Sequence, residues 1–153
     1  MENHPSLNFS DAITISVWVN DPEKEHSGSG IISNSTREDG NTFSYGLEVG
    51  AGEGDYGPRF LLHDGNGANN DWFMDLRGWE IKNRQQWSHV VATYNGASAN
   101  IYLNGELAKS MPAKNQKIDV RKTPILIGSV GGGHYSGDMD DLRLHDRALS
   151  AEE

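Results

Sequence analysis

The stretch that decides the fold reads Trp87-Ser-His-Val-Val-Ala-Thr-Tyr-Asn-Gly96 and continues, after four residues, with Ile101-Tyr-Leu-Asn-Gly105. Both runs are rich in β-branched and aromatic residues, which favour strands. Each run ends in an Asn-Gly pair, and Asn and Gly accept the positive φ values that tight turns require. The stretch therefore predicts two β-strands that are joined by one polar turn and followed by a second turn.

Strand-like segments continue along the rest of the chain. Apolar residues alternate with others over Ile13–Val19, which is the period-two pattern of a strand. Further short β-prone segments, bounded by turn residues, occupy 30–34, 43–49, 59–63, 72–76, 106–109, 124–128 and 138–145. With 18 glycines and no long helical pattern, the sequence predicts an all-β protein, an antiparallel β-sandwich of two sheets.

Length and composition restrict the classes of function. A chain of 153 residues suits one domain with one core, and the absence of cysteine excludes disulfides and thiol catalysis. The net charge of −9 disfavours nucleic acid and anionic membranes as partners, and no apolar run is long enough for membrane insertion. Ser150-Ala-Glu-Glu153 has the spacing of a capping box at the start of a helix. We therefore expect residues 1–153 to be a single domain that is tethered to other domains in a larger protein.

Three separated blocks resemble the laminin-G-like, or concanavalin A-like lectin/glucanase, jelly-roll domains. Trp87–Gly96 with Ile101–Gly105 is similar to the central hairpin of these domains, and Ile13–Val19 to their opening strand. The segments 124–128 and 135–150 are similar to their closing segment. The resemblance implies a concanavalin A-like jelly roll with an extracellular or cell-surface location. It also implies a module that binds sugar or protein, since only a minority of these domains cleave glycans.

A sugar-binding site is predicted around two tryptophans. Trp72 and Trp79 flank a loop-rich region without a family motif, and loops on a rigid sandwich often carry binding residues. An indole ring can stack on the C–H face of a sugar, while amides, carboxylates and imidazoles bind its hydroxyls. Candidates for these polar contacts are His63, Asp64, Asn69 and Asn70. The alternative is that Trp72 and Trp79 fill the core beneath a long loop, as we expect Trp18 and Trp87 to pack in the core or at its edge.

Strand phase suggests a surface for the same site. Glu48 lies on the polar face of its predicted strand, and Arg59 and His63 share one face of theirs. These side chains could line a groove that binds polysaccharide. The alternative is a solvated face with a Glu–Arg ion pair of little energetic value.

A structural calcium ion is the one cofactor that the sequence suggests. Asp138 and Asp140 fall in phase with Leu142 and Leu144, so Asp140 is expected to point inward, where a carboxylate must be paired or bound to metal. The resemblance implies a calcium ion near a sheet edge in related domains, and Asp140 occupies the matching position. The alternatives are an ion pair with Arg143 or Arg147, or hydrogen bonds from nearby backbone amides.

Catalysis is not expected. Glycoside hydrolysis needs two carboxyl groups on either side of the scissile bond, and the Glu-x-Asp-x-Glu strand of glucanases with this fold is missing. The sequence therefore predicts a non-catalytic carbohydrate-binding module of a secreted or surface protein. The alternative is an adhesion module that binds protein, or one that only packs beside a catalytic domain.

Overall fold

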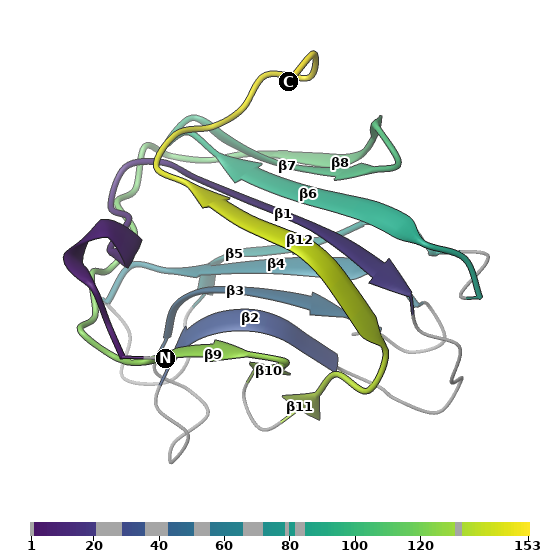
Figure 1. Ribbon diagram of the computed structural model, residues 1–153. Helices are drawn as coiled ribbons and strands as arrows, with labels where there is room; N and C mark the ends of the chain where they lie inside the picture. The colour runs from purple at the N-terminus through teal and green to yellow at the C-terminus, as the bar shows by residue number, and fades with distance from the viewer. Residues whose placement is uncertain are drawn as a thin grey trace.

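The computed structural model describes residues 2–20, 29–35, 43–50, 56–65, 72–78, 80–81, 85–130 and 133–153. It confirms the predicted antiparallel β-sandwich (Figure 1). Sheet A has the strand order β12-β1-β6-β7-β8, and sheet B the order β5-β4-β3-β2-β9. A short ribbon, β10-β11, accompanies them. Among the described residues no helix has the length and apolar composition needed to span a membrane.

Sheet A is built from both ends of the chain. Its strands are β12 (Asp138–His145), β1 (Ile13–Asn20), β6 (Ser88–Tyr94), β7 (Ser98–Leu103) and β8 (Glu106–Pro112). Sheet B contains β5 (Trp72–Arg77), β4 (Pro58–His63), β3 (Phe43–Val49), β2 (Ser29–Ser35) and β9 (Ile125–Ile127). The ribbon consists of β10 (Ser129–Val130) and β11 (Gly133–His134), and a 3-10 helix, η1, covers Pro5–Leu7.

The two Asn-Gly turns form as predicted. Asn104 and Gly105, at φ 51° and 83°, make the two-residue connection between β7 and β8. In the turn between β6 and β7, the Asn95 side-chain oxygen accepts hydrogen bonds from the Ala97 and Ser98 amides at 3.0 and 2.8 Å. Both turns are therefore set by local sequence.

The core lies between the two sheets and is built by strand alternation. Ile13, Ile15, Val17 and Val19 of β1 are at most 2% exposed. They belong to one buried cluster with apolar side chains from the facing sheet, which include Tyr45, Leu47, Val49, Phe60, Leu62, Met74 and Leu76. On sheet A the opposite face stays partly exposed, with Trp18 39% exposed. On sheet B most outward residues of β3 and β4 are buried as well, and Leu61 of β4 clusters with Val130 of the β10-β11 ribbon.

A β-bulge interrupts the pairing of β12 with β1. Ser16 pairs with Arg143 and Trp18 with Asp140, so two residues of β12, Asp141 and Leu142, lie opposite the single Val17 of β1. The extra residue is accommodated at Asp141, whose φ is 50°. The bulge changes which residues face the core: Met139, Leu142 and Leu144 pack against it, whereas Asp140 is exposed.

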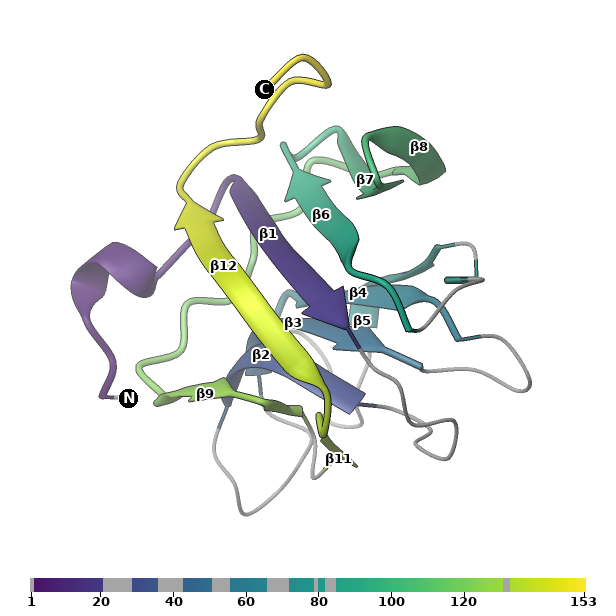
Figure 2. The ribbon, with the colours of Figure 1, turned by 45° about the vertical axis from the view of Figure 1, so that its right-hand side comes forward.

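The segment after β12 turns back over the outer face of sheet A (Figure 2). The Thr14 hydroxyl donates a hydrogen bond to the Arg147 carbonyl at 2.7 Å and accepts one from the Leu149 amide at 3.0 Å. At the predicted capping box, the Ser150 amide donates to the Glu153 carboxylate at 3.1 Å. The two Thr14 hydrogen bonds hold residues 147–149 against the start of β1.

Candidate functional site

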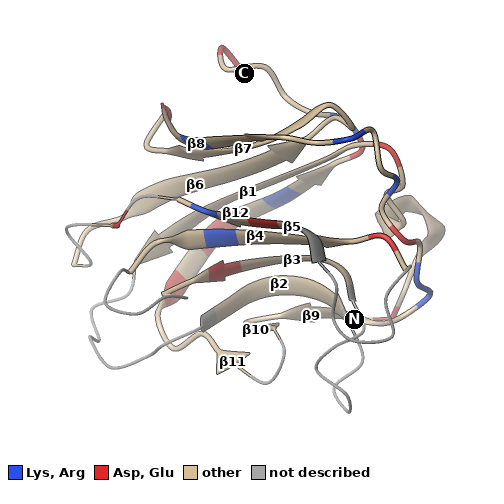
Figure 3. Ribbon diagram, turned by 180° about the vertical axis from the view of Figure 1, so that it is seen from behind, with Lys and Arg blue, Asp and Glu red and all other residues tan. Residues whose placement is uncertain are grey.

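A row of charged side chains crosses the outer face of sheet B. It is formed by Glu48 on β3, Arg59 on β4 and Asp75 with Arg77 on β5, and acidic and basic segments alternate across these strands in Figure 3. Glu48 pairs with Arg59 in the β3–β4 ladder, and Arg59 pairs with Arg77 in the β4–β5 ladder. Residues that are directly opposite each other in a ladder share a face, so the register itself brings the four charges together.

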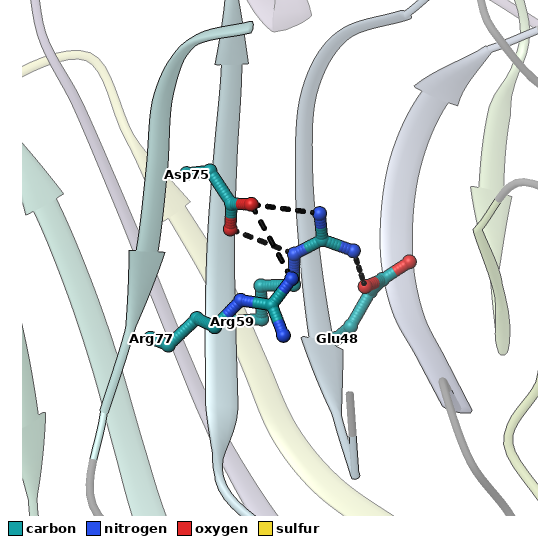
Figure 4. A network of polar contacts seen from close by, with 4 residues as sticks. All are labelled: Glu48, Arg59, Asp75 and Arg77. Atoms are coloured by element: carbon teal, nitrogen blue, oxygen red, sulfur yellow. Dashed lines mark hydrogen bonds and ion pairs between the residues drawn. The ribbon is translucent and has the colours of Figure 1, made fainter. Parts of the chain in front are cut away.

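Arg59 is the centre of this row (Figure 4). Its Nε donates to Asp75 Oδ1 at 2.8 Å and its Nη2 to Asp75 Oδ2 at 2.9 Å, which is the two-pronged geometry that suits a guanidinium and a carboxylate. Its Nη1 donates to Glu48 Oε2 at 3.2 Å, and Arg77 Nη2 donates to Asp75 Oδ2 at 3.5 Å. The donors and acceptors of the row are therefore held in place before any ligand arrives.

Solvent access increases along the row. The exposed fraction of the side chain is 10% for Glu48, 20% for Arg59, 33% for Asp75 and 51% for Arg77. Burial raises the pKa of Glu48 despite the opposing effect of Arg59. Burial also acts to raise the pKa of Asp75, but the hydrogen bonds and charge of Arg59, together with Arg77, outweigh it and lower the pKa. A ligand would therefore meet mainly Asp75, Arg77 and the edge of Arg59.

The other predicted residues at this end of sheet B are only partly described. His63 follows on the same face of β4, but it is 2% exposed, and its Nδ1 accepts a hydrogen bond from the Gly65 amide at 2.8 Å. Asp64 accepts a hydrogen bond from the Gln116 side-chain amide at 3.0 Å. Trp72 pairs with His63 in the ladder, but its side chain lies outside the described residues, as do Trp79, Asn69 and Asn70. A side chain that is 2% exposed does not line an open groove as predicted. The His63 carbonyl also accepts a hydrogen bond from the Asp119 amide at 2.8 Å, and the role of His63 in sugar binding stays a prediction.

Sequence reasoning missed Asp75 and Arg77. They alternate with the buried Met74 and Leu76, so the period-two pattern of this segment contains the signal that could have found them. Their contact with Arg59 depends on the β4–β5 register, which no local pattern encodes.

The tryptophans of sheet A also differ from expectation. Trp18 and Trp87 were expected at packed positions, yet they are 39% and 45% exposed. Trp18 lies on the outer face of β1 and stacks on His89, with ring centroids 4.8 Å apart. Trp18 points outward because side chains alternate between the two faces of a strand. It shares its face with Ser16 and Thr14, and the buried valines of β1 lie on the other face.

Of the two proposed calcium ligands, Asp140 does not point inward as predicted. Asp140 is exposed because the bulge at Asp141 shifts its phase, and its Oδ1 accepts a hydrogen bond from the Asp141 amide at 2.8 Å. Asp138 is exposed too, and it pairs with Asn20, whose Oδ1 is the one buried side-chain polar atom of the described residues without a hydrogen-bond partner. No group of three acidic, His or Cys side chains in the described ranges could hold a metal ion, whereas calcium takes roughly six to eight oxygens. Asp138 and Asp140 therefore do not by themselves fit a calcium site, and calcium binding stays an untested prediction.

Solved structures with the same fold include several binding domains. The binding domain of botulinum neurotoxin serotype G is 16% identical, with a TM-score of 0.69 over 99% of this chain and 37% of that one. Domain 4 of AbnA, an extracellular arabinanase from Geobacillus stearothermophilus, was solved in complex with arabinotriose; it is 16% identical, with a TM-score of 0.68 over 96% of this chain and 66% of that one. The CBM40 of a Ruminococcus gnavus IT-sialidase, bound to α2,3-sialyllactose, is 16% identical, with a TM-score of 0.71 over 94% and 80%.

These identities show a shared fold, and the chain spans only about a third of the neurotoxin domain's length. No curated protein sequence matches the chain. The family evidence comes instead from a family model that matches residues 2–153. With its two antiparallel sheets and this match over nearly its whole length, the chain belongs to the concanavalin A-like lectin/glucanases superfamily.

Proposed function

We propose that the chain is a carbohydrate-binding module of a larger secreted or cell-surface protein, and that it binds polysaccharide on the outer face of sheet B. The observation that carries the proposal is the row formed by Glu48, Arg59, Asp75 and Arg77, in which fixed donors and acceptors grade from buried to exposed. Such a row matches the hydroxyls of a sugar, each of which both donates and accepts a hydrogen bond. The arabinotriose and sialyllactose complexes of similar folds support the same class of ligand.

The geometry of the row supports binding rather than hydrolysis. A glycosidase needs two carboxyl groups with the scissile bond between them, about 5–5.5 Å apart for retention and 6.5–9.5 Å for inversion. Here the guanidinium of Arg59 lies between Glu48 and Asp75 and donates hydrogen bonds to both. That arrangement leaves no place for a glycosidic oxygen between the two carboxyl groups, so we assign the row no catalytic role.

In this proposal the sugar extends along β5. The β4–β5 ladder places the backbone of Trp72 beside His63, on the strand that also carries Asp75 and Arg77. Stacking of a sugar ring on Trp72 remains part of the proposal, with Asp75 and Arg77 as its polar partners on the same strand. An exposed site of this kind buries little area, so we expect modest affinity for each site.

The test is a binding screen against soluble and insoluble polysaccharides, using affinity electrophoresis and pull-down. We expect retention by one polymer class and at least a tenfold loss of affinity in Arg77→Gln and Trp72→Ala. Lys109→Gln is the matched control, because it removes one exposed positive charge from β8 on the other sheet. Equal binding by all three variants would contradict the location of the site. A folded protein that binds no polysaccharide would favour a protein-binding or packing module instead.

A further inference from the structure

A second surface with an exposed aromatic ring lies on the outer face of sheet A. In the ladders of β1, Trp18 is opposite His89 on β6 and Asp140 on β12. The imidazole of His89 stacks on the indole at an interplanar angle of 24°. The ring is thus held flat against its neighbour, while Trp18 as a whole is 39% exposed.

The support for this ring is itself fixed by hydrogen bonds. His89 Nε2 lies 2.9 Å from Ser16 Oγ on β1, and the His89 amide donates to Asn104 Oδ1 at 2.8 Å. A side chain that is already ordered loses little conformational entropy when a ligand binds, so the platform is preorganised.

A groove of about 430 Å³ adjoins the platform. Its volume falls within the range of roughly 300–1,000 Å³ that is typical of small-molecule sites. One side is formed by the bulge of β12, with Asp141 and Arg143, and another by the C-terminal segment, with Arg147 and Glu153. A smaller hollow of about 200 Å³ continues from it beneath residues 149–153 and shares Ser16 and His89 with it.

The charges of the groove compensate each other in pairs. Arg143 Nε donates to Asp141 Oδ1 at 2.8 Å, and Arg147 Nη1 donates to Glu153 Oε2 at 2.8 Å. These side chains are between 43% and 62% exposed, so both donors and acceptors remain open to solvent. Burial lowers the pKa of His89, with Asp141 opposing and Arg143 reinforcing the effect. Beside these pairs, the exposed Asp140 opposite Trp18 and Glu152 of the adjoining hollow add negative charge, which disfavours a phosphate, a sulfate or a polyanion as the ligand.

We infer that this groove is a second carbohydrate-binding site, which takes a neutral sugar ring with its C–H face on Trp18 and its hydroxyls on Asp141 and Arg143. The site is distinct from the row on sheet B, because it lies on the opposite outer face of the sandwich (Figure 2). A neutral sugar fits because it combines an apolar face with hydroxyl groups at its rim, as the groove combines an indole with exposed ion pairs. Two sites on opposite faces would let one module contact two chains of a polysaccharide or two segments of one chain.

The test follows the indole N–H signals of the protein by NMR during titration with neutral oligosaccharides of glucose, galactose, mannose, xylose and arabinose, and separately with sialyl and uronic oligosaccharides. We expect one sugar class to shift the Trp18 signal saturably. In isothermal titration with that sugar, Trp18→Ala should abolish binding at this site, and Asp141→Asn and Arg143→Gln should each weaken it at least fivefold. Asn tolerates positive φ, so Asp141→Asn keeps the bulge, and Arg143→Gln changes an exposed side chain.

The matched control is Trp87→Ala, which removes a tryptophan that is 45% exposed but does not line the groove. The Trp18 shift should persist in this variant and in Arg77→Gln, the sheet B variant, so that failure of one site is distinguishable from failure of the other. A Trp18 signal that no neutral sugar moves would overturn the inference. So would equal losses in Trp18→Ala and Trp87→Ala, or a response only to sialyl or uronic oligosaccharides.

Discussion

At the scale of single residues, Glu48 and Asp75 contact the same guanidinium but differ in pKa. Burial dominates at Glu48 and raises its pKa, whereas at Asp75 the two hydrogen bonds from Arg59 and the charge of Arg77 prevail and lower it. Glu48 has a single contact with Arg59, at 3.2 Å, while Asp75 has the two-pronged one. The number of charge-assisted hydrogen bonds therefore decides which carboxylate the fold stabilises in its charged form.

This difference predicts opposite effects of neutral substitutions on stability. A lowered folded pKa means that Asp75 stabilises the fold above its unfolded pKa, near 3.8, and that this contribution is lost as the pH falls through the folded pKa. A raised folded pKa means that the contribution of Glu48 is complete below its unfolded pKa, near 4.5, and is lost as the pH rises. At pH 7, Asp75→Asn should thus lower the free energy of unfolding by about 1–2 kcal/mol, and Glu48→Gln should leave it unchanged or raise it.

Urea unfolding at pH 7 and at pH 3 would measure both effects. Asp11→Asn is the control, since the Asp11–Lys117 ion pair has side chains that are 69% and 75% exposed and should contribute nothing measurable. Glu48→Gln less stable than Asp75→Asn at pH 7 would contradict the assignment.

At the scale of elements, the bulge in β12 decides the orientation of a whole strand face. It puts Met139, Leu142 and Leu144 against the core and Asp140 with Arg143 outside. The strict alternation assumed for β12 predicts a different set, with Asp140 among the leucines. One extra residue reverses the phase, because the side-chain period of a strand is two.

The bulge predicts which residue types position 141 accepts. Its φ of 50° lies in the left-handed region, which Asp, Asn and Gly accept and β-branched residues do not. Asp141→Val should therefore lower the free energy of unfolding by about 1–2 kcal/mol, whereas Asp141→Asn and Asp141→Gly should stay close to the parent protein. Thermal melts would compare them with Arg143→Val, at an exposed position of the same strand without positive φ. If Asp141→Val were as stable as the parent protein, β12 would pair with β1 without the bulge.

At the scale of the whole molecule, the distribution of charge bears on the proposed ligand. The net charge is −9. Close ion pairs compensate the charges of the row on sheet B, whereas Asp140 and Glu152 add negative charge beside the two ion pairs of the groove on sheet A. The molecule as a whole repels polyanions, and neither candidate surface carries the excess of positive charge that would attract them. Both properties favour neutral glycans as ligands.

This charge distribution predicts that glycan binding is insensitive to salt. For a neutral ligand no ion pair forms across the interface, so raising the sodium chloride concentration from about 0.05 to about 0.5 M should change Kd less than twofold. Isothermal titration at both salt concentrations would measure it. A tenfold weakening in high salt would indicate an ionic ligand and would contradict the proposal of a neutral sugar.

Local sequence predicts a large part of this architecture. Alternation over Ile13–Val19 and the two Asn-Gly turns identify β1 and the β6–β7–β8 meander, because a strand pattern and a turn are properties of adjacent residues. For the same reason, alternation along each strand predicts the faces on which Glu48 and Arg59 lie. The contact of Arg59 with Asp75 was not, because it depends on the pairing of β4 with β5.

The sequence by itself determined the all-β class, most strand positions and the superfamily. These follow from short-range periodicity, from turn residues and from motifs of consecutive residues. Only the tertiary structure decided that Trp18 is exposed beside His89, that His63 is buried, and that the bulge at Asp141 turns Asp140 outward. Each of these outcomes depends on which strand lies beside another and on what covers its outer face. Ladder register and packing are relations between residues far apart in the chain, so the pattern of any one segment does not contain them.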